Sequence, residues 1–147
     1  MILSTPWLDW QLLTKRPVNI GEIAPEAWLD GFPRNVWLGT TVESADYYER
    51  IEALRRIPAS VRFLSLEPLL GPLEDLPLEG IHWAIVGGES GRKRRPMDLE
   101  WVESIALQCD AAGVALFVKQ DEGRFPGRQG RLPDRLWSRK EMPRVGA

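Results

Sequence analysis

Five short segments, each rich in apolar and β-branched residues, recur along this chain and are separated by helical patterns or loops. They cover residues 11–15, 36–42, 61–67, 82–88 and 115–120. Turn-forming residues bound each segment, as is typical of β-strands. Strands of near-continuous apolar character that alternate with helices favour a parallel sheet covered by helices, because such strands are buried on both faces. The sequence therefore predicts an α/β fold whose parallel sheet has about five strands in chain order.

Two longer segments between these strands carry apolar residues at helical spacing. In residues 44–57 an N-cap candidate, Ser44, opens the pattern and Pro58 ends it. In residues 98–112 the apolar side chains again fall on one face, and Gly113 is well placed as a C-cap. We expect both segments to be helices that cover the sheet.

The length of 147 residues is that of a single domain, and no linker or low-complexity tract divides residues 1–147. Residues 121–147 are rich in glycine, proline and basic residues, so we expect an irregular basic C-terminal tail. Residues 1–90 carry 13 acidic and 7 basic side chains, whereas residues 91–147 carry 8 and 12. A basic end can bind nucleic acid or an acidic protein, but a solvated surface is the simpler interpretation.

Composition excludes several classes of protein and of site. Hydrophobic residues make up 44% and charged residues 27% of the chain, which is typical of a globular protein. No apolar run approaches the roughly 20 residues that a membrane-spanning helix needs, and the first ten residues lack the pattern of a secretory signal. One cysteine, Cys109, and one histidine, His82, cannot form a disulfide, an iron–sulfur cluster or a Cys/His zinc site. We expect a cytoplasmic protein with no membrane partner and no bound metal, in which His82 and Cys109 are structural.

Three glutamates, Glu43, Glu67 and Glu89, follow predicted strands and could converge, since the carboxyl ends of parallel strands meet at one edge of a sheet. Converging carboxylates could hold a ribose, an amine or a metal, or perform acid–base chemistry. The alternative, which we favour, is that they form ion pairs with basic residues at neighbouring strand ends. Those basic residues are Lys15, Arg16 and Lys119.

The segment 86–91, with the sequence Val-Gly-Gly-Glu-Ser-Gly, has two interpretations. Its glycines would let backbone N–H groups approach a phosphate or carboxylate closely, and Ser90 adds a hydroxyl group. The alternative is a tight turn after a buried strand. Four basic residues follow directly: Arg92, Lys93, Arg94 and Arg95. They could grip phosphates of a nucleic acid, but we favour a solvated turn, because no aromatic residue interleaves with this run for base stacking.

Seven blocks of the sequence, taken in order, are similar to those of a known family. They are residues 12–17, 35–39, 62–71, 83–91, 95–98, 117–120 and 133–137. On these blocks the chain resembles the C-terminal half of an uncharacterised phage-associated family that is itself similar to radical S-adenosylmethionine enzymes. Members of that family begin with a three-cysteine segment that would hold a 4Fe–4S cluster, followed by one further strand unit. The sequence contains neither of these parts.

The resemblance implies an open, partial TIM-type barrel, in effect a half-barrel, whose strand ends would face adenosylmethionine and substrate. The residues that would line this ligand mouth are Thr41, Glu43, Ser65, Glu67, Gly87, Gly88, Glu89, Ser90 and Lys119. Without cluster-binding cysteines, reductive cleavage of adenosylmethionine cannot occur on this chain. We therefore expect no catalytic residue, no iron–sulfur cluster and at most weak binding of adenosylmethionine.

Three functions are compatible with these expectations. We favour a non-catalytic phage or mobile-element protein that binds a protein partner, for example as an inhibitor of a host system, in the bacterial cytoplasm. The alternatives are a binding protein for adenosylmethionine or a nucleotide-like molecule, and one half of a split radical-S-adenosylmethionine-like enzyme. An open half-barrel has unpaired strand edges and an apolar inner face, so we expect a second copy or a protein partner to cover it. Trp7, Trp10 and the tail around Trp137 are the candidates for that covering. The alternative is that the tail covers the sheet of its own chain, which would then need no partner.

Overall fold

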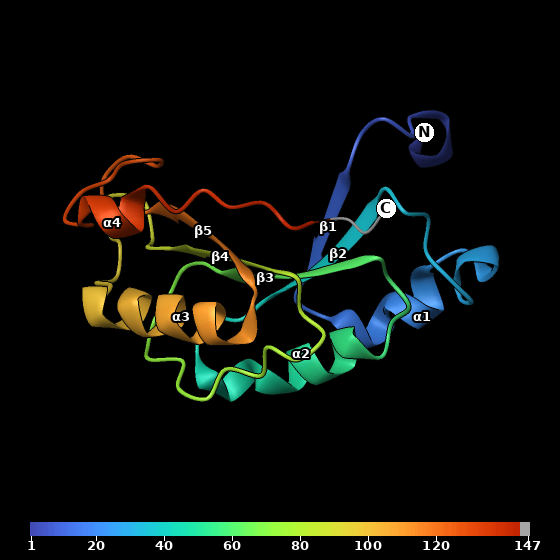
Figure 1. Ribbon diagram of the computed structural model, residues 1–147, viewed down its shortest axis with the longest axis horizontal. Coiled ribbons are helices and arrows are strands. Elements are labelled where there is room, and N and C mark those ends of the chain that lie inside the picture. The colour runs from blue at the N-terminus through green and yellow to red at the C-terminus, as the bar shows by residue number, and fades with distance from the viewer. Residues whose placement is uncertain (145–147) are drawn as a thin grey trace.

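A five-stranded, all-parallel sheet with the strand order β1-β2-β3-β4-β5 forms the centre of the protein (Figure 1). The computed structural model describes residues 1–144. The strands are β1 (Trp10–Thr14), β2 (Val36–Thr41), β3 (Val61–Leu66), β4 (Trp83–Gly87) and β5 (Ala115–Gln120). Each strand pairs with its neighbours in the chain, and the sheet is not closed into a barrel. The predicted α/β fold and its parallel sheet are therefore confirmed.

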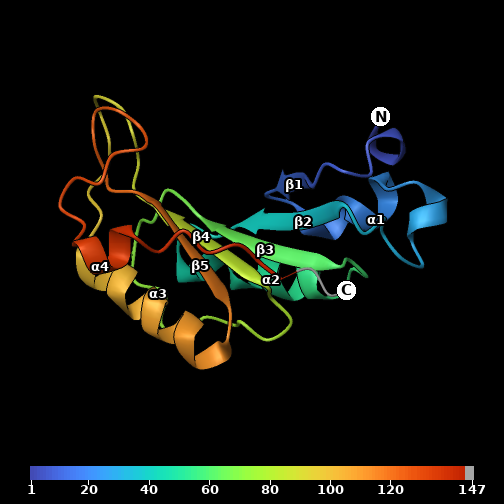
Figure 2. The ribbon, with the colours of Figure 1, turned by 45° about the horizontal axis from the view of Figure 1, so that its top comes forward.

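Helices lie between most successive strands and cover one face of the sheet, while a loop joins β3 to β4 (Figures 1 and 2). The α-helices are α1 (Ile20–Ile23), α2 (Tyr48–Arg55), α3 (Leu99–Ala112) and α4 (Asp134–Trp137). Short 3-10 turns are η1 (Ile2–Ser4), η2 (Pro17–Asn19), η3 (Glu26–Trp28) and η4 (Ala45–Tyr47). The predicted helix over residues 44–57 thus consists of η4 followed by α2. No helix within residues 1–144 is long and apolar enough to cross a membrane.

The longest helix, α3, begins and ends where its capping residues require. The side chain of Asp98 accepts a hydrogen bond from the backbone N–H of Glu100 at 3.0 Å, which satisfies a donor that the first turn leaves free. Gly113 follows the last turn with φ at 68°, in the left-handed region that glycine adopts without strain. The chain can therefore turn directly from α3 into β5.

The main core lies between the sheet and the helices. Alternate strand residues such as Leu38 and Leu64 point to this side, where they meet Ile51 of α2 and Ile105 of α3. All four side chains are buried. This core holds the helices against the sheet and thereby helps to position the carboxyl ends of the strands.

A second, aromatic cluster lies on the opposite face of the sheet. Trp37, Phe63, Trp83 and Phe117 pack with ring centroids 5.8–6.2 Å apart. The C-terminal tail crosses this face in Figure 1, and the backbone carbonyl of Glu141 accepts a hydrogen bond from Trp83 Nε1 at 2.8 Å. The predicted apolar inner face is therefore covered in part by the chain itself.

The tail is more ordered than the sequence predicted. It contains α4, and its backbone then runs antiparallel to β5: Val118 N–H donates to the Arg139 carbonyl at 2.8 Å, and Glu141 N–H donates to the Leu116 carbonyl at 3.0 Å. This pairing closes the β5 edge of the sheet, which the sequence left open. Residues 145–147 of the predicted tail lie outside the described part of the chain.

Candidate functional site

The predicted ligand mouth lies at the carboxyl-terminal edge of the sheet, where β2, β3 and β4 end. Thr41 and Ser65 are register partners on neighbouring strands, and both are buried. Glu43 and Glu67 follow β2 and β3 by one or two residues. The fold thus brings residues from successive strand ends to one edge, as parallel strands require.

Glu43 is buried at this edge and is held by two basic side chains. Lys15, from the end of β1, forms an ion pair with one carboxylate oxygen, and Arg50 Nη1 of α2 lies 3.0 Å from the other. Arg50 also donates to the Thr41 carbonyl at 2.8 Å. Burial alone would raise the pKa of Glu43, but the hydrogen bond from Lys15 and the charges of both bases lower it. Glu43 is therefore an ionised structural group.

Glu67 pairs with Lys119 across β4. Lys119 Nζ lies 2.8 Å and 3.1 Å from the two carboxylate oxygens. Gly87 lies between them in the sheet, and a Cβ added there would contact the Glu67 side chain at 3.4 Å. The opposite charges of Glu67 and Lys119 therefore balance each other at the middle of the carboxyl-terminal edge of the sheet.

Glu89 pairs with Arg95 and not with a strand-end base. The Arg95 backbone N–H, Nε and Nη2 donate to its carboxylate at 2.7, 3.0 and 2.8 Å. The hydrogen bonds from the Arg95 side chain and backbone lower the pKa of Glu89 to about 2. Of the three predicted bases, Lys15 and Lys119 pair with these glutamates, whereas Arg16 is in no ion pair among residues 1–144. The predicted set also missed Arg50 and Arg95.

The glycine segment after β4 packs against another loop. Gly88 N–H donates to the Gln120 carbonyl at 3.1 Å, and Gly91 N–H donates to the Gly123 carbonyl at 2.9 Å. Ser90 forms an isolated parallel bridge with Gly123. A Cβ on Gly88 would lie 2.3 Å from the Glu122 backbone nitrogen. Close backbone packing therefore explains the glycine at position 88, and the N–H groups of Gly88 and Gly91 are already bonded.

Two buried polar residues tie these loops together: Gln120, the last residue of β5, and Asp121, which follows it. Gln120 Nε2 donates to the Gly88 carbonyl, and its Oε1 accepts from Gly127 N–H, both at 2.8 Å. Asp121, which is 2% exposed, accepts hydrogen bonds from the Arg131 backbone N–H and guanidinium at 2.7–2.9 Å. Burial would raise the pKa of Asp121, but the hydrogen bonds from Arg131 lower it. In the sequence, only their position as two polar residues at the end of an apolar strand could have indicated that they have a structural role.

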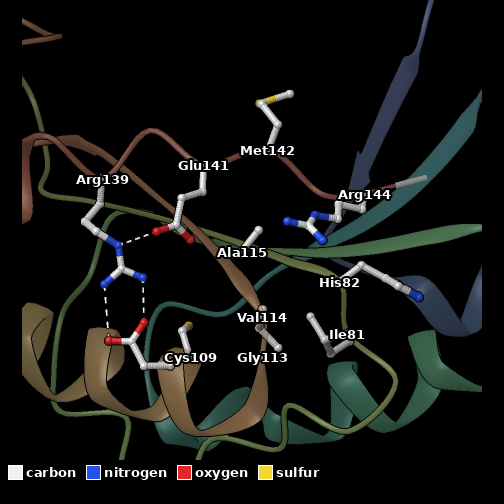
Figure 3. A pocket seen from close by; sticks show the side chains of 11 residues that line it. Ile81, His82, Cys109, Gly113, Val114, Ala115, Arg139, Glu141, Met142 and Arg144 are labelled. Carbon is white, nitrogen blue, oxygen red and sulfur yellow. Dashed lines mark hydrogen bonds and ion pairs between the residues drawn. The ribbon is translucent and has the colours of Figure 1, made fainter. Parts of the chain in front are cut away.

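A cavity of about 540 Å³ lies at the other end of the sheet, around the start of β5 (Figure 3). Arg139 bridges Asp110 and Glu141 there, with Nη2 2.8 Å from Asp110 Oδ1. Burial raises the pKa of Cys109 to about 12, so its thiol stays protonated. His82 Nδ1 accepts a hydrogen bond from Arg62 N–H at 3.0 Å, and Figure 3 shows its ring pointing away from Cys109. These two residues do not form a nucleophile–base pair.

At both ends of the sheet, charged side chains form ion pairs with one another. Among residues 1–144, no three His, Cys, Asp or Glu side chains gather as a metal site. Each of the three predicted glutamates lies beside at least one base. That the nine residues of the predicted ligand mouth bind a ligand stays a prediction.

A different surface lies along β1, the open edge of the sheet. Its central side chains are exposed, whereas all six residues of β2 are buried. Beside it, on the helical face, an apolar groove of about 240 Å³ runs between Leu12 and Leu38 of the sheet and Ile23 and Trp28 of the α1–η3 segment. Sequence reasoning expected unpaired edges but did not locate this groove, because its walls come from three separate segments.

The family of the chain is shown by its sequence. The model of the family described as "Protein of unknown function (DUF5131)" matches residues 1–139, so the chain belongs to that family. Among curated proteins and solved structures, none matches the chain. The phage association and the radical S-adenosylmethionine resemblance stay predictions.

Proposed function

We propose that this family member is a binding protein that docks a partner polypeptide along the β1 edge and the adjoining groove. The partner supplies a strand that extends the sheet parallel to β1, and an amphipathic helix that fills the groove. The role is non-catalytic, in keeping with the ion-paired glutamates at the strand ends.

The distribution of exposed apolar side chains carries this proposal. Within residues 1–144, thirteen large apolar side chains are exposed, and nine of them belong to residues 1–29. They are Met1, Leu3, Trp7, Leu8, Leu12, Leu13, Val18, Ile23 and Leu29. Apolar surface concentrated beside one sheet edge is typical of a protein interface.

The β1 backbone offers hydrogen bonds to an added strand. Trp10 N–H donates to the Asn35 carbonyl at 2.7 Å, on the β2 side. Because donors alternate along a strand of a parallel ladder, Leu12 and Thr14 also bond to β2, while Gln11 and Leu13 present their N–H and C=O groups outward. Strand addition at such an edge is a common way to bind a peptide.

Two exposed leucines of β1, Leu12 and Leu13, also support a docked partner. Leu12, which is 38% exposed, faces the apolar groove, and Leu13, which is 52% exposed, lies on the opposite face in register with Gly39. A right-handed strand–helix–strand connection would place a helix on the face where α1, α2 and α3 already lie. A strand–helix segment would therefore pair with the β1 backbone and fill the groove at the same time.

The predicted tryptophans divide between two roles. Trp7 is 76% exposed near the β1 edge and can contact the partner. Trp137 packs within the chain, with Lys140 Nζ 3.4 Å from its ring centroid. Only the N-terminal side thus needs an external partner, because the tail covers the β5 side.

Photo-cross-linking tests this proposal. A photoreactive residue is placed at Leu13, with Leu107, an exposed apolar residue of α3, as the control position. In cells of the source organism, we expect position 13 to give a discrete cross-link to a different polypeptide and position 107 to give none. Gln11→Pro, which removes one outward N–H, should abolish the cross-link, whereas Gln11→Ala should retain it.

Two outcomes would contradict the proposal. A product at twice the mass of the chain would assign the edge to a second copy. A cross-link that survives Gln11→Pro, in a variant whose circular dichroism and thermal unfolding match those of Gln11→Ala, would show that strand addition is not the mode of binding.

A further inference from the structure

Two loops extend side by side beyond the ends of β4 and β5, as Figure 2 shows. We define them as the basic finger, residues 89–95 and 121–131. The Ser90–Gly123 bridge and the hydrogen bond from Gly91 N–H to the Gly123 carbonyl join them at mid-length. Hence two segments that are about thirty residues apart in the chain form one projecting structure.

Every acidic side chain of the basic finger forms an ion pair with a basic side chain of the same finger. Glu89 pairs with Arg95, Asp121 with Arg131, and Glu122 with Arg94. These pairs lie at the base of the finger and hold the loops in place. They leave no free carboxylate in either loop to repel an approaching anion.

Four further bases belong to the two loops of the finger: Arg92, Lys93, Arg124 and Arg128. All four side chains are exposed, and none has an ion-pair partner among residues 1–144. A protein with a net charge of −2 therefore presents a local cluster of about four uncompensated positive charges.

An aromatic ring lies within this cluster. Phe125 is 60% exposed, and the guanidinium of Arg124 lies 5.4 Å from its ring centroid. The run of bases at 92–95 has no aromatic neighbour in sequence, but the Ser90–Gly123 bridge joins its loop to the loop that carries Phe125. An exposed ring among unpaired cations matches a surface on which an unstacked base packs while its phosphates contact the bases.

From this juxtaposition, we propose that the basic finger binds single-stranded nucleic acid. The phosphates contact Arg92, Lys93, Arg124 and Arg128, and one base stacks on Phe125. A duplex is the poorer ligand, because its bases are stacked on one another and cannot cover the ring. The finger extends from the β4–β5 side of the sheet, away from β1, so this site is independent of the proposed docking edge.

Fluorescence anisotropy with fluorescein-labelled oligothymidylate tests the site. We expect Phe125→Ala to weaken binding by about 5- to 150-fold, the loss typical of one base–aromatic stack, while Phe125→Tyr retains it. Between about 50 and 200 mM salt, log K should fall with log salt with a slope near −3 if four phosphates are neutralised, and Arg92→Gln/Lys93→Gln should reduce that slope by about 1.4.

The matched control is Arg16→Gln/Arg56→Gln, which removes two exposed bases elsewhere and should leave binding unchanged. Two results would overturn the proposal. One is oligothymidylate binding that is insensitive to Phe125→Ala in a variant with unchanged thermal unfolding. The other is equal binding of polyglutamate or of a duplex of the same length, which would indicate attraction to any polyanion.

Discussion

At the scale of single residues, the carboxyl-terminal edge of the sheet is organised by charges that neutralise one another and by one glycine that permits close packing. Glu43, Glu67 and Glu89 each form an ion pair with a base. Gly88 lets the segment after β4 approach the Glu122 backbone. Gly88 and the Glu89–Arg95 pair position the basic finger relative to the sheet, so two residues that resemble part of a ligand site also hold two loops.

We expect Gly88→Ala to lower the free energy of unfolding by about 1–3 kcal/mol, because the added Cβ would force the Glu122 backbone to move. Gly71→Ala is the control, since a Cβ at position 71 meets nothing within 4 Å and should change stability by less than about 0.5 kcal/mol. Urea unfolding of the two variants measures both values. Equal stability of the two would show that position 88 is not packed as described.

At the scale of elements, local patterns predicted the strands and helices well, and long-range pairing could not be predicted. The five strands lie within a residue of their expected bounds, because apolar periodicity and turn residues are local signals. The antiparallel pairing of the tail with β5 and the joining of the two loops depend on contacts between distant segments. For the same reason the sequence indicated Lys15 and Lys119 as partners at strand ends but missed Arg95 and Arg131, which lie in loops.

The Asp121–Arg131 ion pair should make the joined loops sensitive to acid. The folded-state pKa of Asp121 lies below its usual value of 3.8, so its stabilising effect is complete above that value and is lost as the pH falls through the folded pKa. We expect Asp121→Asn to lower the free energy of unfolding by about 1–3 kcal/mol at pH 7. The difference from wild type should shrink as the pH falls below about 4.

Urea unfolding at pH 7 and at a pH below about 4 measures this effect. Asp9→Asn, at an exposed position, is the control and should match wild type throughout. A difference between Asp121→Asn and wild type that stays constant with pH would show that the Asp121 charge does not hold the loops.

At the scale of the whole molecule, the two edges of the sheet differ. The tail pairs with β5 and crosses the aromatic face, so that side is completed by the chain itself. The β1 edge has exposed side chains, outward backbone groups and an apolar groove beside it. The sequence predicted a sheet that needs covering but not which edge the chain would cover. This asymmetry is the basis of the proposed docking function.

Residue-resolved amide hydrogen exchange, measured by NMR on the purified protein at low concentration, tests the open β1 edge most directly. We expect the outward N–H groups of Gln11 and Leu13 to exchange rapidly, and those of Leu12 and Thr14, bonded to β2, to exchange slowly. Equal protection of all four amides at low concentration would contradict the account, because it would show that the chain itself covers the edge assigned to a partner.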